Sequence, residues 1–117
     1  MTYVDGFVAA VPAANKEAYR DHAAKAAVVF KEHDAVSVVE CWGDEVPEGT
    51  INSFHTAVMR KDDEVVVFSW IIRPNKAARD AGWAKSMADP RLSPEGNPMP
   101  FDGKRMIFGG FETILDA

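Results

Sequence analysis

The segment VVVFSWIIR, residues 65–73, constrains the fold more than any other part of the chain. It is rich in β-branched and aromatic residues, follows a charged stretch and ends at Pro74, which together predict a strand. A strand with one face in water alternates apolar and polar residues. This one is apolar at nearly every position, so we expect both faces of its sheet to be buried.

Four more segments have strand character, because short apolar runs stand between turn-forming residues. They are residues 3–11, 36–43, 54–60 and 104–115. The charged stretch KDDE joins 54–60 to 65–73, which predicts a hairpin.

Two segments have the apolar spacing of helices. The first spans residues 15–34, with Asn15 as its predicted cap, and the second runs from residue 75 to about 88. Residues 89–103 are dense in proline and glycine and predict an ordered loop, the best candidate for a lid.

Although five segments have strand character, we interpret the order of elements as β-α-β-β-α-β, a ferredoxin-like α+β fold with a four-stranded antiparallel sheet and both helices on one face. Two helices cover only one face of that sheet. An exposed apolar sheet face would be larger than a soluble monomer usually tolerates. We therefore expect a homodimer that joins two sheets face to face around a barrel-like core.

Size and charge exclude several other classes. The 117 residues suit one domain, residues 1–117. A net charge of −5, with acidic and basic residues mixed, disfavours binding to nucleic acid or to an anionic membrane. Cys41 is the only cysteine, so no disulfide forms within the chain. Because the N-terminal residues lack a basic leader, we expect a cytoplasmic protein.

Three polar side chains in apolar strands are candidates for catalysis: Glu40, Glu112 and His55. A carboxylate in apolar surroundings must be paired, hydrogen-bonded or neutral. One interpretation is a general acid or base with a raised pKa. The other is a salt bridge at an interface, for example to Arg73 or Arg105.

Aromatic and cationic side chains supply candidates for ligand binding. Trp42, Trp70 and Trp83 line a pocket for a ring-containing ligand or fill the dimer core, and Arg91 meets an acidic ligand or pairs with Asp89. Histidine and cysteine spacings typical of metal sites are absent, so we expect no metal and no cofactor. Cys41 is expected to be a packing residue.

The stretch MPFDGKRMIFGGFE, residues 99–112, resembles no phosphate-binding loop, because its glycines lie inside a strand. Gly109 and Gly110 are expected to mark a bulge or the close approach of a backbone or of a ring such as Trp42 or Trp70.

The same stretch, with YVDGFVAAVP, VVECWGDEVP, VVFSWI and MADPR, resembles the YbaA-like family of small bacterial proteins, a domain of unknown function. The resemblance implies the dimeric α+β barrel superfamily, which includes cofactor-independent oxygenases, isomerases and stress-related binding modules. It implies no substrate.

Two functions stay open. One is an oxygenase or isomerase that acts on a small hydrophobic molecule. The other is a non-catalytic ligand-binding or stress-response dimer, with association to RNA as a distant third.

Overall fold

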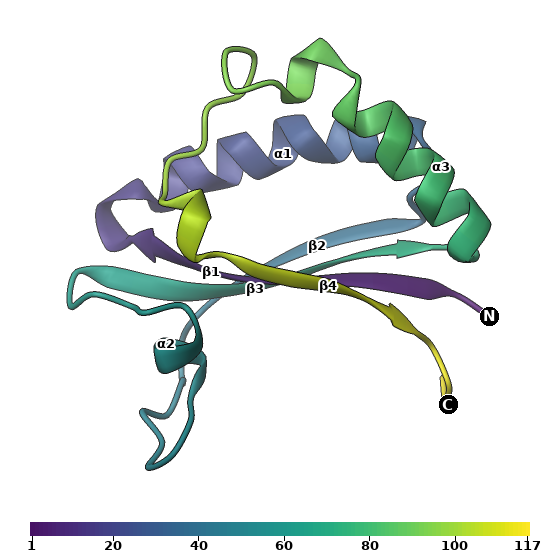
Figure 1. The fold of residues 1–117 in the computed structure, drawn as a ribbon. Coiled ribbons are helices and arrows are strands. Elements are labelled where there is room, and N and C mark those ends of the chain that lie inside the picture. The colour runs from purple at the N-terminus through teal and green to yellow at the C-terminus, as the bar shows by residue number, and fades with distance from the viewer.

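The computed structural model describes residues 1–117 and contains one four-stranded antiparallel sheet, with the strands in the order β2-β3-β1-β4. The strands are β1 (Tyr3–Pro12), β2 (Ser37–Trp42), β3 (Glu64–Arg73) and β4 (Ile107–Glu112). Helices α1 (Lys16–Glu32) and α3 (Lys76–Met87) lie together over one face of this sheet (Figure 1). The α+β class and the four-stranded antiparallel sheet are thus confirmed.

The two central strands pair along their whole length. β1 and β3 pair antiparallel from Tyr3 opposite Arg73 to Pro12 opposite Glu64. Alternate residues of β3 point to opposite faces, so Val67, Ser69 and Ile71 lie under the helices. Phe68 and Trp70 point the other way. The continuous apolar run therefore supplies both faces, as its composition predicts.

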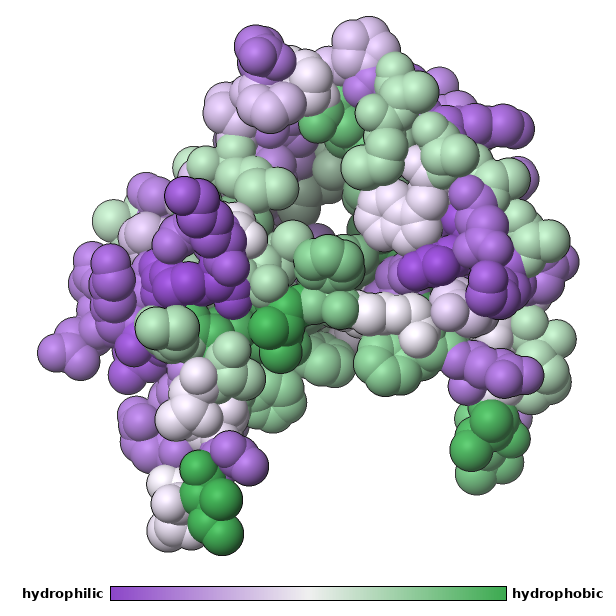
Figure 2. All heavy atoms as spheres, in the orientation of Figure 1, coloured by the Kyte–Doolittle hydropathy of each residue, from purple (hydrophilic) through white to green (hydrophobic).

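The face away from the helices, called the open face below, is largely uncovered. Phe68, Ile107 and Phe111 are 44%, 45% and 62% exposed there. Green, hydrophobic atoms lie along the underside of the sheet and at the tips of the two projections below it (Figure 2).

The prediction of a strand at residues 54–60 is wrong. Phe54–Ala57 form the short helix α2, in which Ser53 Oγ accepts a hydrogen bond from the Thr56 backbone N–H and the Thr56 hydroxyl oxygen accepts one from the Ser53 N–H. The apolar residues of this segment pack on the sheet instead of joining it: Val58 is fully buried against Val8, Ala10 and Val66 at one end of the open face.

Both long helices occur where expected, but only one has the cap expected of it. Asn75 Oδ1 accepts a hydrogen bond of 2.8 Å from the Ala78 N–H at the start of α3. Asn15 precedes α1 without capping it, and its side-chain N–H donates instead to the Pro100 carbonyl at 2.8 Å. That bond ties the loop 89–103 to the beginning of α1.

The last strand is shorter than predicted, because residues Gly103–Arg105 form a 3-10 turn before it. Asp102 Oδ1 accepts from the Lys104 N–H at 3.1 Å, and the Arg105 guanidinium pairs with Glu64 at 2.6 Å. Hydrogen bonds from Arg105 lower the pKa of Glu64 to about 2. These contacts fix the chain at the point where it enters the sheet.

Gly109 and Gly110 form no bulge, since β4 stays in unbroken register with β1. A ring does approach, as expected, but it belongs to neither tryptophan. A Cβ on Gly110 would lie 2.5 Å from the Tyr3 hydroxyl and 2.9 Å from Arg79 Nη2. A side chain at this position would displace both groups.

No helix has both the length and the apolar character needed to cross a bilayer.

Candidate functional site

A cavity of about 510 Å³ lies between the helix layer and the sheet. Its walls are mainly apolar, with Phe7 from β1, Phe30 from α1 and Trp83 from α3 among them. The loop 89–103 contributes a roof of Leu92, Asn97, Met99 and Phe101. The space-filling view shows an opening between the two layers (Figure 2). This volume suits a small molecule.

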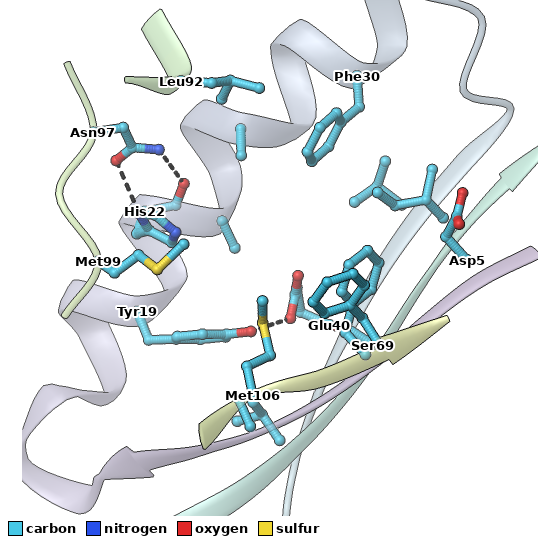
Figure 3. Close-up of a pocket in the computed structure, with 18 of the residues that line it drawn as sticks. Asp5, Tyr19, His22, Phe30, Glu40, Ser69, Leu92, Asn97, Met99 and Met106 are labelled. Atoms are coloured by element: carbon cyan, nitrogen blue, oxygen red, sulfur yellow. Dashed lines mark hydrogen bonds between the residues drawn. The ribbon is translucent and has the colours of Figure 1, made fainter. Parts of the chain in front are cut away.

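Glu40 is one of two carboxylates that line the cavity, the other being Asp5. Glu40 points from β2 toward Tyr19 of α1, whose hydroxyl donates to Glu40 Oε1 at 2.5 Å (Figure 3). Ser69 stands opposite Glu40 on β3. The carboxyl opens into the cavity and Glu40 is still an exposed residue of β2, although the side chains around the carboxyl partly desolvate it. This desolvation raises the pKa of Glu40, and the hydrogen bond from Tyr19 lowers it more weakly.

Tyr19 holds its proton firmly. Burial is the main cause of its raised pKa, and the neighbouring charge of Glu40 raises it further. The phenol is therefore a hydrogen-bond donor throughout the neutral range, which keeps one carboxylate oxygen of Glu40 occupied.

A second polar cluster closes the cavity at the α3 end. Asp5 of β1 is 3% exposed and accepts hydrogen bonds from Arg79 Nε and Nη2, at 3.1 and 2.8 Å, and from Trp83 Nε1, at 3.1 Å. Arg73 is fully buried, with its Nη1 3.6 Å from Asp5 Oδ2. Burial lowers the pKa of Arg73, and the charge of Asp5 opposes that effect. The Asp5 carboxylate is thus the counter-charge of two guanidinium groups, those of Arg79 and Arg73.

The third polar pair joins the roof to α1. His22 Nδ1 lies 3.0 Å from Asn97 Oδ1, and Asn97 Nδ2 donates to the His22 carbonyl at 3.0 Å (Figure 3). Burial lowers the pKa of His22, and the contacts to Asn97 and to the Pro98 carbonyl raise it more weakly. The imidazole is therefore neutral at neutral pH.

The predicted site residues do not come together. Of the three catalytic candidates, only Glu40 lines this cavity. Glu112 lies at the exposed end of β4 and borders a groove on the open face. His55 is on α2, not on a strand, with its Nδ1 3.1 Å from Glu48.

The predicted ligand-binding residues separate in the same way. Trp83 lines the cavity, and Trp70 lies on the open face. Trp42 packs beside Tyr19, with ring centroids 6.3 Å apart. Arg91 pairs with Asp89 and with Glu32, at 2.7 and 2.8 Å, which links the roof to the end of α1.

Sequence reasoning missed Tyr19, His22, Asn97 and Asp5 as site residues. Asp5 carried a usable signal, because it is a lone carboxylate inside the apolar run YVDGFVAAV. Tyr19 was placed on the inner stripe of the helix, but nothing local revealed its partner on β2. Asn97 lies in an irregular loop, where no apolar periodicity predicts which side chains face the cavity.

Residues 2–103 match the family described as "Protein of unknown function (DUF1428)". The chain belongs to this family. It is 58% identical, over 116 residues and 99% of each chain, to the "Uncharacterized protein YbaA" of Escherichia coli (strain K12) and equally to that of Shigella flexneri. The resemblance found in the sequence is confirmed, and no activity is attached to these DUF1428 relatives by name.

No three histidine, cysteine, aspartate or glutamate side chains are grouped so that they could hold a metal ion. The polar side chains that line the cavity of this DUF1428 protein include Glu40 and His22, which are titratable, and Tyr19, which is a hydrogen-bond donor.

Proposed function

We propose that this cavity binds a small uncharged hydrophobic molecule and that Glu40 exchanges a proton with it. The observation that carries the proposal is a carboxyl with a raised pKa inside a largely apolar cavity of about 510 Å³. A general acid or base works best when its pKa is near the working pH. A charged ligand would lose its hydration in this cavity without gaining a free counter-charge, because Arg79 is already paired with Asp5 and Asp80.

Removal of a proton from carbon is the first step of an isomerisation and also of an oxygenation that uses no cofactor. We propose one of these two reaction types. They share the base and differ in whether the resulting carbanion is reprotonated or reacts with dioxygen.

We further propose that the protein is a homodimer of ferredoxin-like subunits, a dimeric α+β barrel joined through the open face. The proposal is supported by the apolar side chains that this face presents to solvent. They are Val4, Phe68, Trp70, Ile72, Ile107 and Phe111. A second copy would bring the same surface to meet them, as in an isologous interface. A cytoplasmic location suits the exposed thiol of Cys41.

The function is tested with 2-tetralone, an uncharged bicyclic ketone with an acidic C–H bond. The wild-type protein is expected to accelerate deuterium exchange at that carbon in D₂O, followed by proton NMR. Glu40→Gln should reduce the acceleration by about 100-fold or more, the usual contribution of general acid–base catalysis. Glu112→Gln, the same change outside the cavity, should leave it intact.

Each outcome has a meaning. Exchange without oxygen uptake identifies the isomerase type, and oxygen consumption identifies the oxygenase type. Binding of 2-tetralone without exchange supports the non-catalytic alternative. That alternative is favoured by one observation: the polar groups of the cavity already have protein partners. If the protein neither binds 2-tetralone nor exchanges its hydrogen, the proposal is refuted. Association with RNA stays a distant alternative for a chain of net charge −5.

A further inference from the structure

His22 stands in the same cavity as Glu40, but its hydrogen bonds leave it in a different chemical state. Two contacts to Asn97 are made at once, one to the imidazole and one to the backbone of His22. The second contact fixes the amide, since only Asn97 Nδ2 is able to donate to the His22 carbonyl. The amide oxygen must then face His22 Nδ1.

A carbonyl oxygen accepts and does not donate, so the proton of the neutral imidazole belongs on Nδ1. In that tautomer Nε2 carries the lone pair, and the Pro98 carbonyl also lies beside the ring. In the close-up the ring lies between Asn97 and Met99, with its second nitrogen directed away from the Asn97 amide and toward the interior (Figure 3). The arrangement is that of a base held in one tautomer by a second side chain.

Tyr19 separates the two proton-exchanging groups. Its ring centroid is 6.4 Å from that of His22, while its hydroxyl is 2.5 Å from Glu40. His22 and Glu40 therefore line the cavity on different parts of its wall.

We propose that His22 Nε2 is a second acid–base group of this site, that Asn97 is its positioning residue, and that the substrate is an uncharged cyclic ketone. The inference rests on the proposed function, because it needs a molecule in this cavity. Nε2 takes the proton from the carbon next to the carbonyl, and the C–H electron pair becomes the C=C bond of an enol. The carbonyl oxygen receives a proton from the Glu40 carboxyl, so no net charge is created on the molecule. Reversal of the two transfers returns a proton to the same carbon and the O–H proton to Glu40, which restores the ketone with hydrogen exchanged at that carbon.

The environments of the two groups favour this exchange. Burial raises the pKa of Glu40 and lowers the pKa of His22, so the ordinary gap between a carboxyl and an imidazole narrows. A narrower gap lowers the cost of a reversible proton shift between the two groups.

The test uses the same 2-tetralone exchange with His22→Asn. The amide nitrogen of asparagine takes the place of Nδ1 and keeps a donor toward Asn97, but no group replaces Nε2. We expect a loss of about 100-fold in exchange with 2-tetralone binding retained. His33→Asn, at the C-cap of the same helix and outside the cavity, is the matched control and should leave exchange unchanged.

A spectroscopic measurement examines the role of Asn97 independently of turnover. The ¹⁵N shifts of the His22 ring should show the Nδ1–H tautomer in the wild type and a mixture of tautomers in Asn97→Ala. Protonated Nε2 in the wild type would overturn the inference. So would full exchange by His22→Asn while Glu40→Gln is inactive, a result that leaves the proposed function standing. If the wild-type protein shows no exchange, both the role of His22 and the proposed catalytic function are contradicted.

Discussion

The two faces of the sheet are built from the same strands but differ in the polar groups they carry. Under the helices, Asp5, Glu40 and Ser69 interrupt the apolar surface, and helix residues such as Tyr19, Arg79 and Trp83 hydrogen-bond to two of them. The open face has apolar residues at the corresponding inner positions of β1 and β3. A polar side chain can be buried on a sheet without a large desolvation cost only where another layer supplies its hydrogen-bond partner. The covered face therefore carries the chemistry, and the open face is suited to association.

The largest expected effect comes from charging the open face. Phe68→Asp should weaken self-association by about 100-fold or more, because a buried carboxylate would stand at the centre of an apolar contact. Sedimentation velocity over a range of concentrations measures it. Val28→Asp changes an equally exposed residue on the outer side of α1 and serves as the control. A wild-type chain that is monomeric at micromolar concentration would contradict the dimer.

The covered face is tested by removing the carboxylate that its arginines share. Asp5→Ala leaves Arg73 fully buried without a counter-charge, and we expect a loss of about 3–5 kcal/mol in the free energy of unfolding. Urea denaturation gives the value. Asp80→Ala removes an exposed partner of Arg79 and should lower the free energy of unfolding far less. Equal losses in the two variants would show that burial of the cluster is unimportant.

The smallest effect concerns Glu40 and depends on pH. Because its pKa is raised in the folded state, the stability linked to its protonated form is present at low pH and is lost as the pH rises through the folded-state pKa. Glutamine resembles the protonated form at every pH. Thermal unfolding of Glu40→Gln should therefore occur a few degrees above the wild type near about pH 8, and at the same temperature near about pH 4. A variant that melts below the wild type at high pH would mean that the ionised form is the favoured one.

The sequence allowed prediction of whatever depends on local pattern. Strand β3, both long helices and the loop 89–103 follow from periodicity and from proline and glycine. The strand prediction for residues 54–60 is wrong because a segment that packs on a sheet can have the same apolar composition as a strand within the sheet. Val58 is buried by β1 and β3, not by strand neighbours of its own.

The candidate site was predictable only through Glu40 and Trp83. Its other parts are pairs of residues far apart in the chain: Tyr19 and Glu40 are 21 positions apart, and His22 and Asn97 are 75 apart. No local pattern encodes such a pair. The alternation of β2 placed Glu40 on one face, but only the position of the helices shows that this face is the cavity.

The roof of the cavity is attached to α1 by three polar contacts, from Asn15 to Pro100, from His22 to Asn97 and from Glu32 to Arg91. Each of these links is a contact that water replaces at low cost. Phe101 of the same loop also packs on Tyr19 and His22, and none of these contacts involves the pairing of the four strands. The residence time of a bound molecule and the stability of the fold are consequently separate quantities, and a change in the roof is expected to alter the first without the second.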